Sequence, residues 1–468
     1  MNWTKENIHE LVEKQKEYFL TNETFDLKFR KRQLIKLRDA IANNKEKIEE
    51  ALYKDLGRSK VESYLLDTGV IIMEINEIIH NLKKWAKPEL HFSGLAVFPS
   101  IFTRLYKIPY GTTLIISPYN FPFLLSVGVL AASISGGNTA ILKCSSKSKY
   151  STEALIKIIG KIFDPKYVAV VDGGHDIADF LLEEKVNKIF YTGSPNVGKH
   201  VMELASKNLT PVALELGGEN GNWAVVRKDA NIKDAARKIA WMKICNSGQI
   251  CININQVAVA SEVADEFVSE LKKEFERQIG KDPLNNPEYG KLIGNKAFEF
   301  CEGEANKYKD RTVYGGKGNK ETLKFEPTII YPVTIDEEIV RKELFCPLLP
   351  VVKFEDSNVN EVLDTMQRRE HPLAFYLFTK NIKWAKKIMQ TIQFGGGCVN
   401  EVCYHLVVNG VSFNGVGHSG MGAYHGVWGF REFTHPCTVL FGKTKFNLSL
   451  REHPYTKSKE NLIKKFLK

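Results

Sequence analysis

Two cysteines in the stretch CNSGQICININQVAVA differ in the chemistry that their surroundings permit. Cys245 closes the helical pattern DAARKIAWMKIC, whose apolar residues recur on one face, so it is expected to pack in the core. Cys251 follows the polar run 246–249, which predicts a loop that exposes the sulfur and offers backbone N–H donors. An exposed thiol near oriented amides can act as a thiolate nucleophile. The residues therefore favour Cys251 as a nucleophile, with a purely structural thiol as the alternative.

Two other side chains have the types that a nucleophilic thiol needs beside it. Glu215 lies within the apolar strand pattern VALEL, before two glycines, and burial raises the pKa of a carboxyl group toward that of a general base. An ion-paired structural glutamate is the alternative. Asn120 lies between two prolines in PYNFP, where rigid flanks can fix its amide as an oxyanion donor. The alternative there is an Asx turn.

A glycine turn, GSPNVGK (193–199), follows the strand pattern KIFYT and precedes the helical pattern HVMELASKN. Such a turn directs backbone N–H groups and a helix N-terminus at a phosphate. It also fits the start of a P-loop, but His200 stands where the Mg²⁺-binding Ser or Thr should be. We therefore expect a dinucleotide pyrophosphate here, with a plain strand-to-helix connection as the alternative.

The composition indicates which broad class of protein this chain belongs to. The chain has 468 residues, 43% hydrophobic and 26% charged, which is typical of a globular protein with about two or three domains. A net charge of +10 is small at this length and does not indicate a nucleic-acid partner. The N-terminus lacks the apolar segment of a signal peptide, and eight cysteines without CxxC spacing indicate reduced thiols in the cytoplasm. Cys398, Cys403 and His405 match no metal motif, so no metal is expected.

The elements that must position these residues follow from hydrophobic periodicity. The first ~85 residues read as amphipathic helices, and the basic run 28–39 reads as a solvated helix face. Strand and helix patterns alternate over 112–260, and a second alternating series covers about 255–410. The uncharged segment 111–142 is broken by prolines and glycines, so it predicts buried strands and a helix rather than a membrane span. The series predicts an α/β fold with a doubly wound parallel sheet.

Taken in order, the motifs resemble the aldehyde dehydrogenase superfamily over nearly the whole chain. The segments that carry the resemblance to its class 3 branch are DLGRSKVESYLLDTG, PYNFP, YTGSPNVGK, LELGG, NSGQIC, ELFCP and SGMGAYHG. The resemblance implies NAD(P)-dependent oxidation of a medium-chain, long-chain or aromatic aldehyde to the acid. It also implies a cofactor domain with a doubly wound parallel sheet, a second α/β domain for catalysis, and a small β element for bridging and oligomerisation.

The resemblance assigns roles to individual residues. Cys251 matches the thiol that attacks the aldehyde, Asn120 and the Cys251 backbone N–H match the oxyanion donors, and Glu215 matches the base that activates water. Lys143 matches the lysine that holds the adenosine ribose. The residues that match the pyrophosphate turn are Gly193, Ser194, Val197 and Gly198. Glu343 would bind the nicotinamide ribose, and Phe345 would flank the nicotinamide.

The same resemblance implies domain limits and an assembly. Residues 1–84 and 109–211 would form the NAD(P)-binding domain, and 212–408 the catalytic domain. Residues 85–108 and 409–468 would form the bridging and oligomerisation element and the C-terminal tail, in a homodimer. The tail REHPYTKSKENLIKKFLK predicts a short basic amphipathic helix, which permits contact with a membrane surface or packing over a partner subunit.

Several positions depart from the family pattern, namely Cys144, Ser146, Cys346, Ser412 and Asn414. Ser146 replaces a glutamate that contacts the ribose hydroxyls in the family, so NADP is expected to be tolerated beside NAD. The other departures lie near the cofactor and could reduce the rate. Two further functions stay open on the same scaffold: an aldehyde dehydrogenase that transfers the acyl group to CoA, and a catalytically impaired binding protein.

Overall fold

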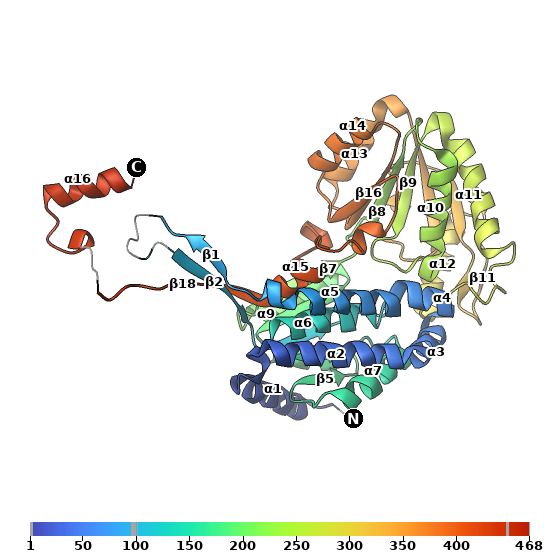
Figure 1. The fold of residues 1–468 in the computed structure, drawn as a ribbon. Helices are drawn as coiled ribbons and strands as arrows, with labels where there is room; N and C mark the ends of the chain where they lie inside the picture. Colours follow the sequence, from blue (N-terminus) through green and yellow to red (C-terminus); the bar gives the residue numbers. More distant parts are fainter. Residues whose placement is uncertain (1–2, 95–99, 101, 446–448, 468) are drawn as a thin grey trace.

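The computed structural model describes residues 3–94, 100, 102–445 and 449–467. The fold is mixed α/β and is built on two largely parallel sheets (Figure 1). In that view the six-stranded sheet and the N-terminal helices form the lower part of the body, and the seven-stranded sheet forms the upper part. The α/β architecture predicted from the alternating patterns is confirmed.

The six-stranded sheet has the order β17-β7-β6-β3-β4-β5 and is parallel except at its edge strand β17. Its strands are β3 (Thr112–Ile116), β4 (Thr139–Lys143), β5 (Val168–Val171), β6 (Lys188–Gly193), β7 (Val212–Leu216) and β17 (Gly420–Met421). The chain adds β4 and β5 on one side of β3 and then β6 and β7 on the other, so the strand order reverses between β3 and β6. Ligands of open α/β sheets bind at the carboxyl ends of the strands beside such a reversal.

Helices cover both faces of this sheet because its strands are apolar on both sides. On one face lie α1 (Lys5–Leu20), α8 (His175–Glu183) and α9 (Pro195–Ser206). On the other lie α2 (Leu27–Asn43), α6 (Val129–Gly136) and α7 (Lys149–Ile162), with α3 (Lys45–Leu56), α4 (Lys60–Ser63) and α5 (Gly69–Trp85) packed outside them. The basic run 28–39 falls in α2, which buries Leu34, Leu37 and Ile41 and exposes most of its charges, as predicted.

The uncharged segment 111–142 forms β3, a loop, a helical segment from Leu124 to Gly136 and β4. Its side chains are almost all buried between the sheet and its helices. Among the described residues no helix combines the length and the apolar character needed to cross a bilayer. The reading of this segment as buried strand, loop and helix is confirmed.

The seven-stranded sheet has the order β10-β13-β14-β9-β8-β15-β16 and is parallel except at the pair β10–β13. Its strands are β8 (Asn222–Val226), β9 (Ile254–Ala260), β10 (Thr312–Tyr314), β13 (Thr328–Val333), β14 (Leu348–Phe354), β15 (Ala374–Phe378) and β16 (Gly396–Val399). Its helices are α10 (Ile232–Ile244), α11 (Ala264–Ile279), α12 (Asn295–Lys307), α13 (Val359–Arg368) and α14 (Ile382–Thr391). The short strands β11 (Gly318–Asn319) and β12 (Lys324–Phe325) pair beside it. Because β7 pairs with β6, the change of sheet falls between β7 and β8, one strand after the expected limit at 211.

A three-stranded antiparallel sheet projects from the body (Figure 1). It consists of β1 (Glu89–Phe92), β2 (Phe102–Pro109) and β18 (Thr434–Leu440), and α15 (Gly426–Glu432) precedes β18. The tail forms α16 (Lys457–Phe466) at the far end of this arm, so the predicted tail helix is confirmed. Within the expected bridging segments and the expected N-terminal part, residues 1–2, 95–99, 101, 446–448 and 468 lie outside the described residues.

Candidate active site

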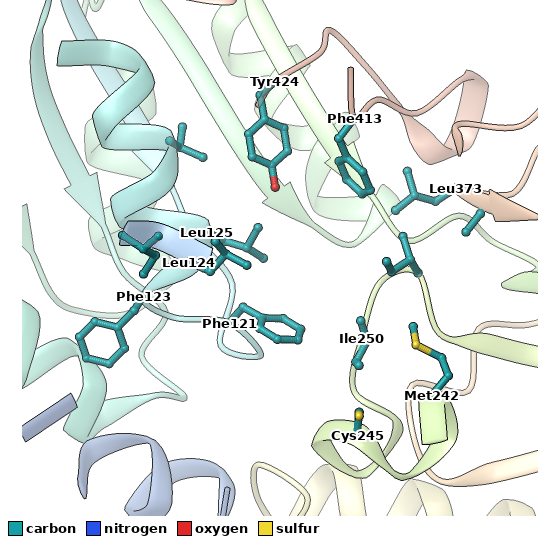
Figure 2. Packing of buried hydrophobic residues seen from close by; sticks show 14 of the residues in the cluster. Phe121, Phe123, Leu124, Leu125, Met242, Cys245, Ile250, Leu373, Phe413 and Tyr424 are labelled. Carbon is teal, nitrogen blue, oxygen red and sulfur yellow. The ribbon is translucent and has the colours of Figure 1, made fainter. Parts of the chain in front are cut away.

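Cys245 and Cys251 occupy different environments. Cys245 caps the C-terminus of α10, is 5% exposed, and packs in the same apolar cluster as Met242 and Ile250 (Figure 2). Cys251 lies between α10 and β9 and is partly exposed. The interpretation of Cys245 as core packing is confirmed, and Cys251 is the member of the pair that a ligand could reach.

The polar run 246–249 is buried, which corrects the expectation of an exposed loop. Its side chains are satisfied inside the protein: the Asn246 amide donates to the backbone oxygens of Asn120 (3.1 Å) and Gln249 (2.9 Å). The Gln249 amide donates to the Lys291 carbonyl (3.0 Å) and accepts from the Ile293 N–H (3.0 Å). Buried polar groups are tolerated when they are hydrogen-bonded, so local polarity did not imply exposure here.

Glu215 lies inside β7 at 3% exposure, between Thr192 of β6 and Gly420 of β17. Within the described part of the chain both carboxylate oxygens are buried without a hydrogen-bond partner, so no ion pair explains this glutamate. Burial raises its pKa well above the usual value, and the nearby Glu432 carboxylate adds to the increase. A buried carboxyl group with a raised pKa and free oxygens has the properties of a general base.

The thiol of Cys251 lies within electrostatic range of two carboxylates. Burial, and after it the charges of Glu215 and Glu343, raise the pKa of Cys251 to about 12, although a hydrogen bond with the Ile252 N–H opposes the increase. These interactions place Glu215 and Glu343 near the sulfur although they are distant in the sequence. The tertiary structure thus brings the candidate nucleophile and the candidate base together.

Asn120 connects the loop after β3 with the thiol loop. It is 3% exposed, and its side-chain amide donates to the Gln249 carbonyl at 3.1 Å. This partner is remote in sequence, so the described contact is not an Asx turn, which would be local. The contact uses one of the two amide hydrogens of Asn120 and holds its nitrogen beside the residues that lead into Cys251.

The turn after β6 fits a phosphate. Helix α9 begins with Pro195, and in the described structure no side chain caps its first turn, which leaves N–H groups for an anion. Gly198 lets α9 approach β7, because a Cβ there would lie 2.9 Å from the Leu216 side chain. Gly193, Ser194 and Val197 surround the same turn at the carboxyl end of β6.

Lys143 ends β4 at the same edge of the sheet and is 4% exposed. Its ammonium donates to the carbonyls of Cys144 (2.9 Å) and Gly173 (2.8 Å), and burial lowers its pKa. These contacts use two of the three ammonium hydrogens, so one is left to bind a ligand at this edge.

Glu343 and Phe345 lie where the two sheets face each other. A Cβ at Gly217 would lie 2.2 Å from a carboxylate oxygen of Glu343, so Gly217 leaves room for the Glu343 side chain in its present position. Burial raises the pKa of Glu343 to about 8. The Phe345 ring packs edge-on against Tyr119, with centroids 6.0 Å apart, next to Asn120. Groups expected at the nicotinamide end of a cofactor therefore gather near Cys251 and Glu215.

Comparison with known proteins identifies the family of a chain with this geometry. The aldehyde dehydrogenase family profile matches residues 1–439. The chain belongs to the aldehyde dehydrogenase family. It is 36% identical to the 4,4'-diaponeurosporen-aldehyde dehydrogenase of Staphylococcus aureus (strain NCTC 8325 / PS 47) over 97% of each chain. It is 35% identical to the Arabidopsis thaliana aldehyde dehydrogenase family 3 member H1 over 97% of this chain and 93% of that one.

Solved structures agree with this assignment. The Staphylococcus aureus AldH in its substrate-bound state matches this enzyme with a TM-score of 0.95 and 35% identity over 100% of both chains. The glyceraldehyde-3-phosphate dehydrogenase GapN of Methanocaldococcus jannaschii, complexed with NADP, matches with a TM-score of 0.82 and 26% identity over 95% and 96% of the chains. The resemblance to the class 3 branch is confirmed, and the enzyme carries out NAD(P)-dependent oxidation of an aldehyde.

Two residues of this aldehyde dehydrogenase that contact the site were not predicted. The Asn222 side chain donates to the carbonyls of Cys251 (2.7 Å) and Asn253 (2.9 Å) and accepts from the Ala374 N–H (2.7 Å). Its position at the head of the apolar strand NWAVV was a signal that could have found it. Burial raises the pKa of Tyr424, and the charges of Glu215 and Cys251 contribute, so its phenol lies near both. Tyr424 lies in the motif SGMGAYHG, which carried the family resemblance but was given no role for this residue.

The departures from the family pattern are accommodated by packing. Cys144 and Cys346 are each 2% exposed, and the Cys346 carbonyl accepts from Lys243 at 3.4 Å. The Ser412 hydroxyl donates to the Asn414 side chain at 3.0 Å.

Among the described residues no group of three or more His, Cys, Asp or Glu side chains could hold a metal ion. Cys398 and His405 instead contact each other, with the sulfur 3.4 Å from Nδ1.

Proposed function

We propose that Cys251, Asn120 and Glu215 oxidise an aldehyde to the carboxylic acid with water as the acyl acceptor. The observation that carries the proposal is the Glu215 carboxylate, which is buried, has no described hydrogen-bond partner, and lies within electrostatic range of the Cys251 thiol. A carboxylate in this position costs folding free energy, and its role as a base accounts for its presence.

The chemistry proceeds through intermediates on the sulfur. The Cys251 thiol gives its proton to solvent water, and the resulting thiolate attacks the carbonyl carbon to form a hemithioacetal, whose oxyanion accepts from the free Asn120 N–H and the Cys251 backbone N–H. Loss of a hydride gives the thioester. Glu215 then takes a proton from water, the hydroxide attacks the thioester carbon, and the acid leaves as Cys251 is restored. The overall reaction consumes the aldehyde, NAD(P)⁺ and water and yields the acid, NAD(P)H and a proton.

The residues at the carboxyl edge of the six-stranded sheet fit the cofactor. The uncapped first turn of α9 would hold the pyrophosphate, the free hydrogen of Lys143 the adenosine ribose, and Glu343 the nicotinamide ribose. When bound, the nicotinamide supplies the hydride acceptor. Phe345 and Tyr119 would restrict its position beside Cys251.

Use of NADP beside NAD is the expected consequence of Ser146, which is exposed just after β4. A hydroxyl there does not repel a 2′-phosphate, whereas a carboxylate would. We expect kcat/KM for NADP within about tenfold of that for NAD, and Ser146→Glu to lower only the NADP value, by roughly tenfold or about 1.4 kcal/mol. Steady-state kinetics with both cofactors measures this. Strict NAD dependence of the unmodified enzyme would contradict the prediction.

The substrate class that we propose is an apolar aldehyde, of medium or long chain or aromatic. Buried apolar side chains, among them Phe121, Ile250 and Phe413, lie around the thiol loop (Figure 2). The diaponeurosporen-aldehyde dehydrogenase, whose name specifies an aldehyde substrate, is a relative over almost the full length.

An NAD(P)H-formation assay over straight-chain aldehydes of increasing length, with benzaldehyde beside them, tests both the reaction and its substrate class. We expect kcat/KM to rise by up to about fourfold per added CH₂, which corresponds to the ~0.8 kcal/mol of burying one. Absence of turnover with every aldehyde would overturn the proposed reaction. Values that are flat or that fall with length would overturn the apolar substrate class.

We further propose a cytoplasmic homodimer, with the partners and domain limits expected from the family except that β7 belongs to the first domain. The arm of β1, β2 and β18 supports a dimer, because it carries exposed apolar side chains such as Phe92 and Phe102 that a second subunit would cover. Sedimentation equilibrium tests the dimer, and a monomer at micromolar concentration would disprove it.

The tail helix α16 exposes Leu462 among lysines, so we propose that it also contacts anionic lipid. Absence from anionic liposome pellets would remove that role.

A further inference from the structure

Arg58 is a fully buried arginine between α3 and α4, far from any cofactor element in sequence. Its Nε donates to the Asn246 side-chain oxygen at 2.8 Å, its Nη1 to Asp67 at 2.8 Å, and its Nη2 to the Asn120 carbonyl. The guanidinium also lies 4.4 Å from the centre of the Phe121 ring. One planar fork therefore contacts both the loop after β3 and the thiol loop.

The thiol loop needs such external support. Asn246 and Ser247 have φ values of +51° and +50°, a left-handed conformation that non-glycine residues rarely adopt. Besides its contact with Arg58, Asn246 donates from its backbone N–H to Glu62 at 2.5 Å and from its amide to the Asn120 carbonyl at 3.1 Å. The strained turn is thus held by residues of the α4 region and by Asn120.

Asp67 fixes the guanidinium in turn. It is fully buried, and its second oxygen accepts from the Leu124 N–H at 2.5 Å. Burial raises the pKa of Asp67 to about 6, and Arg58 opposes the increase. The chain Leu124–Asp67–Arg58 leaves the guanidinium one orientation, in which its two remaining arms reach Asn120 and Asn246.

We propose that Arg58 is a positioning residue that sets the separation between the Asn120 amide and Cys251. By holding the Asn120 carbonyl and the Asn246 amide on one rigid fork, it aligns the two loops from which the oxyanion donors come. The inference rests on the roles proposed for Asn120 and Cys251. A lysine keeps the positive charge but not the fork geometry, so Arg58→Lys separates positioning from simple charge burial.

We expect Arg58→Lys to lower kcat by roughly 10- to 100-fold, because donors displaced by even about 1 Å lose that much. KM and the NADH dissociation constant, from fluorescence titration, should stay within about threefold. Arg30→Lys is the matched control, because Arg30 is also buried, at 4% exposure, and donates to the carbonyls of Thr24 and Ser135. The control should lose thermal stability but keep kcat.

A double-mutant cycle with Asn120→Ala tests whether Arg58 acts through Asn120. In the Asn120→Ala background, Arg58→Lys should lower kcat by less than about threefold further, because the donor it aligns is already gone. Full additivity of the two changes, or equal kcat losses in Arg58→Lys and Arg30→Lys, would overturn the proposal. Inactivity of the wild type would overturn the proposed function instead.

If Arg58→Lys does not fold, Asn246→Ala replaces it in the cycle. This change removes the hydrogen bonds of the Asn246 side chain to Arg58, Asn120 and Gln249 but leaves the Arg58–Asp67 pair intact. The same fall in kcat and the same lack of additivity with Asn120→Ala are expected. Additive losses would again overturn the proposal.

Discussion

Replacing Cys251 with serine should lower aldehyde-dependent NAD(P)H formation by at least roughly 10³-fold, because an alcohol is a far weaker nucleophile than a thiol at neutral pH. The substitution removes only the polarisable sulfur, and the loop around it is held by Asn222, Asn246 and Gln249. The fold should therefore persist. Steady-state rates and the thermal midpoint of unfolding, measured on the same preparation, separate the two effects.

Cys245→Ser is the necessary control, because this cysteine lies in the same loop region. Its sulfur packs in an apolar cluster, so a hydroxyl there should cost about 1–3 kcal/mol of folding free energy. The kcat of the folded variant should stay within about threefold of wild type. Loss of turnover in Cys245→Ser with retention in Cys251→Ser would reverse the assignment of the nucleophile.

The second large effect is expected from Glu215→Gln, which keeps the shape of the side chain but cannot accept the proton of water. Steady-state turnover should fall by roughly 10²–10⁴-fold. Acylation does not need this base, so a burst of about one NAD(P)H per active site should precede the slow phase. Stopped-flow absorbance resolves the burst, and mass spectrometry should detect the acyl group on Cys251.

The pH dependence follows from the raised pKa of Glu215. Below that pKa the carboxyl group is protonated and cannot act as a base, so wild-type turnover should fall as the pH is lowered through it. This limb should be missing from the Glu215→Gln profile. Because the folded chain disfavours the ionised form, Glu215→Gln should not lower the thermal midpoint at neutral pH.

Glu49→Gln is a control for this variant, since Glu49 is also buried, at 5% exposure, but lies in α3 and pairs with Lys45 at 3.9 Å. Its turnover and pH profile should match the wild type. A Glu215→Gln variant with normal turnover would remove the water-activating role. If turnover instead required CoA and survived the substitution, the CoA-acylating alternative would replace hydrolysis.

Sequence alone determined much of the fold, because its signals are local and periodic. Continuous apolar runs such as TTLIIS and TAILK read as buried parallel strands, and they are β3 and β4. The glycine turn before α9 and the apolar face of α10 were also predicted from neighbouring residues. The order of the motifs then identified the family, because a family pattern consists of residue types in a fixed order along the chain.

The sequence also separated Cys251 from Cys245, but partly for the wrong reason. The run 246–249 is polar, and its polarity alone suggested exposure. In the structure the run is buried, because Arg58, Asn120 and Lys291 supply its hydrogen-bond partners. Whether a polar segment is solvated or satisfied internally depends on partners that the segment itself does not contain.

Only the tertiary structure decided which groups meet. Arg58 contacts Asn246 across 188 positions of sequence and Asn120 across 62, and Asn120 contacts Gln249 across 129. Tyr424 and Glu432 reach Glu215 because the chain returns through β17 and α15 after building the second sheet. Local patterns fix an element and its buried face, whereas the pKa of Glu215 and the alignment of Asn120 depend on what other elements bring near them. The sequence thus determines which residue types are present for aldehyde oxidation, and the packing of the two sheets determines how those residues lie relative to one another.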